Sequence, residues 1–300
     1  MRVFVTGASG HIGGAVVPEL LAAGHEVVGL ARSDESAAKL EAAGAEVRRG
    51  DLDDLDGLRE AAATADGIIH LAFKHGLMAT GEMEAAIAAD MAATEAFGEV
   101  LAGTDKPFVN TSGTLMLAMM GLGRTGTEDD RSPGGHRADV ENATLALADR
   151  GVRSSVIRLS PLVHSDLDEH GFGPSLIGIA RAKGFAGYPG EGTNRWPAVH
   201  TLDAARLYRL AVESAPAGQI LHGVGDEGVA LRDIGAAIGR GTGLEARSVP
   251  EAEIPDYFGF LAGFITLDDP TSNAKTRELV GWEPTHPGLI ADYDAGHYFE

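Results

Sequence analysis

The chain has 300 residues, of which 44% are hydrophobic, and this is enough apolar material for one large domain or two unequal lobes. Its formal net charge of −20 disfavours nucleic acid and anionic membrane surfaces as partners, because binding either would require clustered lysines and arginines. The absence of cysteine excludes disulfides, thiolate nucleophiles and cysteine-ligated metals.

The amino terminus, MRVFVTGASG, passes from Met1 directly into a strand-like run, without a basic stretch that leads an apolar one. We therefore expect no secretion signal. No apolar run approaches the ~20 residues that a membrane span needs. These features predict a cytoplasmic protein that acts on a small molecule.

Short β-rich apolar runs alternate with longer helical patterns in the first half of the chain. The predicted strands cover residues 2–6, 26–30, 46–49, 67–71, 107–111 and 153–159. The predicted helices between them cover residues 11–23, 33–43, 55–63, 81–101 and 136–150. Six strands with five crossovers predict an α/β fold with a Rossmann-type doubly wound parallel sheet.

The regular alternation stops after Pro161, and residues 171–197 are rich in glycine, proline and aromatic side chains, which predicts loops and short elements. Strand-like segments at residues 196–200 and 219–222 are expected to return the chain to the first domain. The predicted division is a dinucleotide-binding domain at 1–160 with 196–222, and a smaller substrate-covering lobe at 161–195 and 223–300.

A glycine-rich turn lies between the first strand and the first helix, and it predicts a dinucleotide site. Gly7 permits a tight turn, Gly10 lets a pyrophosphate approach the backbone, and Gly13 lets the helix pack closely on the strand. The helix amino terminus then offers unpaired N–H groups to the phosphates. The predicted binding residues of this turn are Thr6, Gly7, Ser9, Gly10, His11, Ile12 and Gly13.

The end of the second predicted strand should contact the adenosine ribose. It reads Gly29-Leu30-Ala31-Arg32-Ser33, so no acid stands at its tip, and Arg32 with Ser33 can donate hydrogen bonds to a 2′-phosphate. These two residues favour NADP over NAD. Asp34 is the feature that would favour NAD, unless it belongs to the first turn of the next helix.

With TGASGHIG in place, the chain resembles the extended short-chain dehydrogenase/reductase superfamily, in particular its NAD-dependent epimerase/dehydratase branch. Further segments in register are Gly50-Asp51-Leu52, His70-Leu71-Ala72, Asn110-Thr111-Ser112, and Val199-His200 before Asp203. The resemblance implies that Asp51 and Leu52 frame the adenine, that Leu71, Ala72 and Phe73 line the cofactor cleft, that Thr111 and Ser112 lie beside the reacting carbon, and that Ser160, Leu162 and Val163 contact the nicotinamide amide.

The superfamily usually has a catalytic tyrosine followed four residues later by a lysine, and this chain has no such pair. Alignment through Glu141 puts Pro133 at the tyrosine position and Arg137 at the lysine position. Arg137 can still bind the nicotinamide ribose, but guanidinium does not release a proton near neutral pH. Candidates for proton transfer are His136 and His75, and the hydroxyl of Ser112 or Thr114.

Flexible apolar side chains follow the fifth predicted strand, and they include Met116 and Met120. We expect them to line a largely apolar substrate pocket, which Phe172, Tyr188 and Trp196 close from the other side. The alternative is that these side chains pack as core. The 11 histidines show no paired helical spacing with carboxylates, so we expect no metal site.

The sequence therefore predicts an NADP-dependent oxidoreductase that moves a hydride to or from a small carbonyl or alcohol. An epimerase or dehydratase with a retained cofactor is the second enzyme hypothesis. A dinucleotide-binding sensor without turnover is the third, because the tyrosine and lysine are missing. A homodimer is left open.

Overall fold

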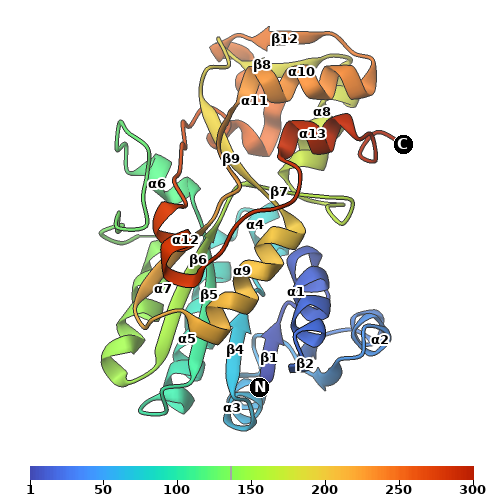
Figure 1. Ribbon diagram of the computed structural model, residues 1–300. Coiled ribbons are helices and arrows are strands. Elements are labelled where there is room, and N and C mark those ends of the chain that lie inside the picture. Colours follow the sequence, from blue (N-terminus) through green and yellow to red (C-terminus); the bar gives the residue numbers. More distant parts are fainter. Residues whose placement is uncertain (136) are drawn as a thin grey trace.

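The computed structural model describes residues 1–135 and 137–300. Its centre is a parallel sheet of seven strands in the order β10-β6-β5-β4-β1-β2-β3 (Figure 1). These strands are β1 (Arg2–Thr6), β2 (Glu26–Ala31), β3 (Glu46–Arg49), β4 (Gly67–His70), β5 (Pro107–Gly113), β6 (Arg153–Leu159) and β10 (Gln219–Gly223). The strand order reverses between β1 and β4, so the fold is the predicted Rossmann-type doubly wound α/β fold.

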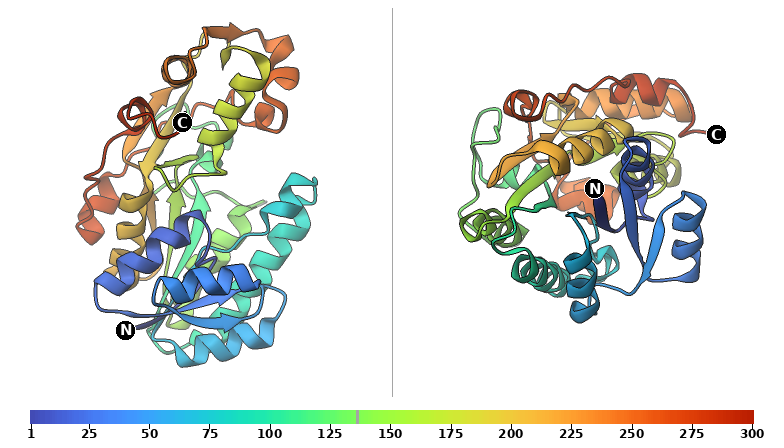
Figure 2. Two further views of the ribbon diagram at one scale, coloured as in Figure 1. Left: turned by 90° about the vertical axis from the view of Figure 1, so that its right-hand side faces the viewer. Right: turned by 60° about the horizontal axis from the view of Figure 1, so that its bottom comes forward.

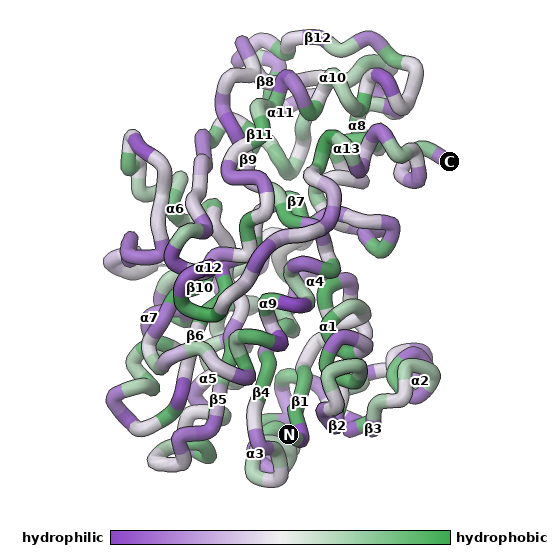
Figure 3. The backbone as a smooth tube through the Cα atoms, in the orientation of Figure 1, coloured by the Kyte–Doolittle hydropathy of each residue, from purple (hydrophilic) through white to green (hydrophobic). Residues whose placement is uncertain are grey.

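Both faces of the sheet are buried, and the side chains of β1 illustrate this. Val3 and Val5 belong to the apolar cluster on one face, whereas Phe4 belongs to the cluster on the other. A parallel sheet that is covered on both faces needs continuous apolar strands. Figure 3 accordingly shows β1 and β4 as hydrophobic segments within the molecule.

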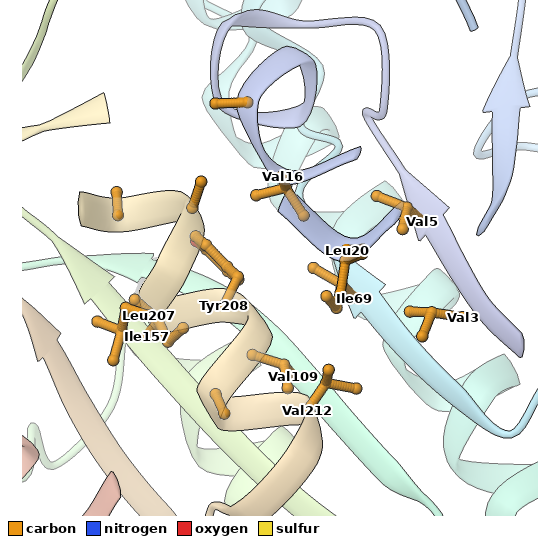
Figure 4. Close-up of a cluster of buried hydrophobic side chains, with 14 of the residues drawn as sticks. Val3, Val5, Val16, Leu20, Ile69, Val109, Ile157, Leu207, Tyr208 and Val212 are labelled. Carbon is orange, nitrogen blue, oxygen red and sulfur yellow. The ribbon is translucent and has the colours of Figure 1, made fainter. Parts of the chain in front are cut away.

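Helices α1 (His11–Ala22), α2 (Asp34–Ala42) and α9 (Thr201–Ser214) contribute to the core on one face of the sheet. Figure 4 shows Val16 and Leu20 of α1 near the sheet residues Val3 and Ile69, with Tyr208 of α9 beside them. Helices α3 (Leu55–Thr64) and α5 (Met83–Leu101) cover the other face. The seventh strand, β10, comes from the segment predicted at residues 219–222.

The remaining crossovers differ from the prediction in detail. The helix expected at residues 81–101 is preceded by a short separate helix, so that α4 (His75–Ala79) and α5 follow β4. The helix expected at residues 136–150 is α7 (Arg137–Ala146), followed by the 3-10 helix η1 (Leu147–Arg150). Residue 136 lies outside the described residues. A further short helix, α6 (Leu115–Met119), follows β5.

A smaller lobe lies beyond the carboxyl ends of the central strands (Figures 1 and 2). It has a three-stranded sheet, β11-β9-β7, and a two-stranded sheet, β12-β8. The strand expected at residues 196–200 is β9, which pairs with β7 and β11 rather than with the seven-stranded sheet. The elements of this lobe are β7 (Leu162–His164), α8 (Phe172–Lys183), β8 (Ala186–Pro189), β9 (Arg195–His200), β11 (Asp226–Ala230), α10 (Leu231–Thr242), β12 (Ala246–Val249), η2 (Glu251–Glu253), α11 (Ile254–Phe258), η3 (Gly259–Gly263) and α13 (Leu289–Asp294). Helix α12 (Ala274–Val280), which was expected in the smaller lobe, packs instead against β10 and α9 of the central domain.

The prediction of loops and short elements at residues 171–197 is wrong for its first half, where α8 forms a helix of 12 residues. Its apolar side chains Leu176, Ile177 and Ala180 have helical spacing and are buried in the small-lobe core. That burial stabilises the helix in spite of Gly173 and Gly178, whose cost in an isolated helix is about 1 kcal/mol each. Within the described part of the chain, no helix combines the length and hydrophobicity that crossing a membrane requires.

Candidate functional site

The turn between β1 and α1 is built so tightly that two of its glycines cannot be replaced without movement. Gly7 has a φ of +66°, and a Cβ atom there would lie 2.8 Å from the amide nitrogen of Ala72. A Cβ atom on Gly13 would lie 2.2 Å from the carbonyl oxygen of Gly7. The amide of Gly10 donates to that same carbonyl at 3.0 Å. These glycines therefore bring the start of α1 directly over the end of β1.

Gly10 precedes α1 and has no side chain that could cap the helix. The first-turn N–H groups thus remain available to an anion, in a field made favourable by the helix dipole. Thr6, predicted to bind cofactor, has a fully buried side chain. Its Oγ1 accepts from the amide of Ala72 at 3.2 Å and lies 2.6 Å from Nδ1 of His70. Thr6 therefore holds the chain that follows β4 in place.

At the end of β2, the side chains of Arg32 and Ser33 are exposed. The Ser33 hydroxyl accepts from the amide of Ser36 at 3.1 Å, so it caps α2. Asp34 is in the first turn of α2, where the Arg49 guanidinium donates to it at 2.6 Å. Arg49 also donates to the Ser33 carbonyl at 2.7 Å. The tip of β2 therefore presents the guanidinium groups of Arg32 and Arg49, and the nearby Asp34 carboxylate is paired with Arg49.

The residues predicted beside the adenine follow β3. The Asp51 carboxylate accepts from the amide of Asp53 at 2.8 Å, and the Leu52 side chain is buried in the core. The Lys74 ammonium in turn binds Asp53. Asp51 and Leu52 thus form a fixed turn at the carboxyl edge of the sheet. Their contact with adenine stays a prediction.

Arg137, at the start of α7, lies against the segment that follows β4. Its guanidinium carbon is 4.1 Å from the centre of the Phe73 ring, and its Nη2 donates to the Thr111 carbonyl at 3.0 Å. Asp90 lies 3.8 Å from the same nitrogen. Desolvation lowers the pKa of Arg137 and the Asp90 carboxylate raises it, and guanidinium stays charged at neutral pH. The guanidinium is thus a fixed cation beside the carboxyl end of β5, and its correspondence to the superfamily's lysine stays a prediction.

Ser112 ends β5 beside α6, and its hydroxyl contacts the sulfur of Met116 at 3.8 Å. The Ser112 side chain is mostly buried, while Met116 and Met120 are half-buried. The ring of His75 lies 5.2 Å from that of Phe73. Desolvation and the nearby Arg137 cation lower the pKa of His75. His136 lies outside the described residues.

Tyr208 of α9 was not predicted for the site, yet its hydroxyl lies 2.8 Å from Oγ1 of Thr111. Thr111 also donates to the carbonyl of His70 at 2.7 Å. Tyr208 is fully buried, and desolvation raises its pKa above the ordinary tyrosine value. The sequence carried no signal for Tyr208, because no lysine stands four residues after it.

The residues predicted beside the nicotinamide amide turn their side chains into the protein. The Ser160 hydroxyl donates to the Gly223 carbonyl at 2.9 Å, and Leu162 is buried in the small-lobe core. Val163 packs against the main core. Only the backbone of this segment remains for the predicted contact with the amide.

The aromatic residues predicted at the substrate pocket lie at different depths. Trp196 is fully buried in the small lobe, with its ring 5.8 Å from that of Phe172. Phe172 is half-buried and also approaches the exposed ring of Phe260 at 6.3 Å. Tyr188 packs near Gly192 and within the aromatic edge of the small-lobe core. Phe172 is thus nearer the surface, and Trp196 supports it from behind.

Comparison with known proteins agrees with this arrangement. The model of the NAD dependent epimerase/dehydratase family matches residues 3–222. The chain belongs to this family. The family is described as NAD dependent, and the tight glycine turn, the uncapped helix terminus and the fixed Arg137 of this epimerase/dehydratase family member fit a nicotinamide dinucleotide.

An uncharacterized protein of Schizosaccharomyces pombe is 45% identical over 299 residues, which cover 100% of both chains. The 4-hydroxy-2-methyl-3-oxo-4-farnesyl-3,4-dihydroquinoline-1-oxide ketoreductase of Stigmatella aurantiaca is 29% identical over 231 residues, covering 73% of this chain and 67% of that protein. The UDP-glucuronic acid 4-epimerase of Bacillus cereus, solved with UDP-glucuronic acid and NAD, shares the fold with a TM-score of 0.77 at 16% identity. That likeness covers 100% of this chain and 98% of the epimerase.

Proposed function

We propose that the protein is an NADP-dependent oxidoreductase acting on a small, largely apolar carbonyl or alcohol. The observation that carries the proposal is the convergence of Ser112, Arg137 and the glycine turn at the carboxyl end of one parallel sheet. The related ketoreductase of Stigmatella aurantiaca, by its name, reduces a ketone. Met116 beside Ser112 supports an apolar substrate.

The preference for NADP is supported at the tip of β2. Arg32 and Ser33 are exposed there, and the acid that would favour NAD, Asp34, is bound by Arg49. A 2′-phosphate would gain charge-assisted hydrogen bonds from guanidinium groups in this position. A ribose 2′-hydroxyl would find no unpaired acid at the strand tip.

The dinucleotide, when bound, supplies or accepts the hydride. The Ser112 hydroxyl would donate a hydrogen bond to the substrate oxygen and so stabilise its developing negative charge. Arg137 would hold the nicotinamide ribose and add positive potential without releasing a proton. In alcohol oxidation His75, whose lowered pKa favours the neutral ring, would accept the proton of the alcohol. In carbonyl reduction the product oxygen would take its proton from solvent.

The proposal is tested by titrating the purified protein with NADPH and NADH, and then by following reduced-nicotinamide absorbance with aldehydes, ketones and enones. Tighter binding of NADPH and substrate-dependent oxidation are expected. Equal affinity for the two cofactors would contradict the NADP preference. Binding without oxidation by any carbonyl would contradict the reductase.

A dinucleotide sensor without turnover is the second candidate, and Tyr208 is the observation that favours it. The hydroxyl of Tyr208 contacts Thr111, but this phenol is buried and its pKa is raised. Its proton therefore exchanges slowly. A sensor would bind NADPH tightly, change conformation on binding, and leave every carbonyl of the panel unreduced.

A further inference from the structure

The first residue of α1, His11, belongs to a partly buried polar cluster that joins the glycine turn to the small lobe. Its Nε2 lies 2.9 Å from Oγ1 of Thr201, at the start of α9. Its Nδ1 lies 3.6 Å from the carboxylate of Asp168, between β7 and α8. Tyr298, near the carboxyl terminus, contacts the other oxygen of that carboxylate at 3.4 Å. We call His11, Ser165, Asp168, Thr201 and Tyr298 the His11 cluster.

The hydrogen bonds of Thr201 fix the tautomer of His11. The Thr201 hydroxyl donates its only proton to the carbonyl of His164 at 3.2 Å, and it accepts from the Ser165 hydroxyl at 2.9 Å. With its proton given to that carbonyl, Thr201 accepts from His11, and we assign the hydrogen of the neutral ring to Nε2 on this ground. In the neutral ring Nδ1 is then bare, and its lone pair faces Asp168.

Asp168 offers this bare nitrogen no proton at neutral pH. Its side chain is 2% exposed, and one of its oxygens accepts from the amide of Gly171 at 2.8 Å. Burial raises the pKa of Asp168 to about 6, so the carboxylate is charged at pH 7. Desolvation and then the neighbouring His164 lower the pKa of His11 to about 4. Two acceptors thus face each other across 3.6 Å, and the pair lacks one proton.

The other titratable groups around the His11 cluster do not supply the missing proton. His164 is bound to Asp292 at 2.8 Å, and its ring lies 5.5 Å from that of His200. Tyr298 packs on Tyr293, with ring centres 5.0 Å apart. Asp168 is among the groups that raise the pKa of both phenols. Neither phenol therefore gives its proton to Asp168 at neutral pH.

We propose that His11 takes up one proton at Nδ1 when the diphosphate of the dinucleotide binds to the first turn of α1. The charged ring then lies between two anions, the diphosphate at the helix start and the buried Asp168 carboxylate, and it donates to Asp168. The proton comes from solvent. The proposal rests on the proposed function only through dinucleotide binding, and not through hydride transfer.

The physical reason is that each nearby negative charge favours the protonated imidazole. In the free protein desolvation and the neighbouring His164 keep the pKa of His11 low. The diphosphate adds a second anion within the first turn of the helix, where its field at the ring is strongest. Proton uptake also couples cofactor binding to the small lobe, because protonated His11 forms a bond with Asp168 that neutral His11 cannot form.

Linkage gives the sign of the pH dependence. Since the bound state holds one more proton, dinucleotide affinity falls as pH rises, by at most about tenfold per pH unit for a single group. The decline begins as the pH rises past about 4, the pKa of His11 in the free protein, and ends above the pKa of His11 in the complex. With that second pKa near the ordinary histidine value of about 6.5, the affinity falls between about pH 4 and pH 6.5 and is constant at higher pH.

The test is calorimetric titration with NADPH in two buffers that have different enthalpies of ionisation, at about pH 6.5. The wild-type protein is expected to take up a measurable fraction of a proton. His11→Gln, which keeps a donor for Thr201, is expected to lose the uptake and the pH dependence of the dissociation constant. His170→Gln removes an exposed imidazole of the same loop and is the matched control. The His170→Gln variant should keep both the proton uptake and the pH dependence of the dissociation constant.

Absence of proton uptake in the wild type, or the same uptake in His11→Gln, would overturn the proposal. If His11→Gln does not fold, Asp168→Asn provides the second variant, and its uptake should be reduced because the buried anion is gone. Binding with proton uptake but without carbonyl reduction would support the His11 proposal while contradicting the reductase. If neither dinucleotide binds the wild type, both proposals fail.

Discussion

At the scale of single residues, the proposed chemistry depends first on Arg137. Its guanidinium is fixed by Phe73, Thr111 and Asp90, so it can hold a ribose but supplies no proton. The hydroxyl of Tyr208 lies nearby but is buried. Substrate activation would therefore depend on Ser112, and cofactor choice on Arg32.

Replacing Arg32 with alanine should weaken NADPH binding by about 1 to 3 kcal/mol, the range of a charge-assisted hydrogen bond. NADH binding should stay nearly unchanged, because NADH has no 2′-phosphate. The measurement is fluorescence titration with both cofactors. Arg240→Ala, which removes a guanidinium paired with Asp294 in the small lobe, is the control. Equal losses for the two cofactors would refute the assignment of Arg32.

Ser112→Ala should lower kcat for carbonyl reduction by about 100-fold, because the developing oxyanion loses its donor. NADPH affinity should not change, since Ser112 is expected beside the substrate. Steady-state kinetics and cofactor titration separate the two effects. Ser214→Ala removes an exposed hydroxyl at the end of α9 and should leave kcat as it is. A fall in NADPH affinity without a change in kcat would place Ser112 elsewhere.

At the scale of elements, the β1–α1 turn depends on a close approach of backbone atoms. Gly13 lies where a Cβ atom would overlap the Gly7 carbonyl and Ala8, whereas Gly14 has nothing within 4 Å of a built Cβ atom. Neighbouring glycines of one helix thus have opposite requirements. The first is needed for close packing, and the second is a replaceable helix residue.

Gly13→Ala should therefore abolish NADPH binding, because α1 must move away from the end of β1. Gly14→Ala is its matched control: it should keep binding and raise the free energy of unfolding by roughly 0.5 to 1 kcal/mol through helix propensity. Cofactor titration and urea unfolding of both variants check this. Normal NADPH affinity in Gly13→Ala would mean that the turn relaxes without loss of the site.

At the scale of the whole molecule, two buried ionisable groups from distant segments have opposite effects on the stability of the fold at acid pH. Burial lowers the pKa of His222 to about 4, and it raises the pKa of Asp269 to about 7. Asp269 accepts from the Thr114 hydroxyl at 2.7 Å, across 155 positions of sequence. Acidification below pH 6.5 destabilises the fold through the histidine, because the unfolded chain then binds more protons. The same acidification stabilises the fold through the aspartate.

The aspartate contribution can be isolated with Asp269→Asn. The folded pKa of Asp269 exceeds its unfolded value, so the native protein gains stability as pH falls through about 7. Between about pH 8 and pH 5, the wild type should gain roughly 2 to 3 kcal/mol relative to Asp269→Asn. Urea unfolding at both pH values measures this. Glu251→Gln removes an exposed carboxylate, and its stability should change with pH as that of the wild type does. The same pH response in Asp269→Asn as in the wild type would contradict the prediction.

The sequence predicted well where the determinant was local. The six strands of the first half and the β1–α1 turn follow from short β-rich runs and from glycine spacing, which need no distant partner to be recognised. Local composition misled for α8, since its glycines suggested loops while burial of Leu176 and Ile177 stabilises a helix. The burial of the Trp196 side chain likewise depends on the residues that pack around it, and not on the local sequence.

The sequence by itself determined the fold class, the tight glycine turn and the absence of the usual tyrosine and lysine pair, because each is written in a short segment. Only the tertiary structure decided which side chains meet. Tyr208 reaches Thr111 across 97 positions, and His11 reaches Thr201 across 190. Such contacts depend on how whole elements pack, and burial then sets the pKa of each group. No local pattern records either.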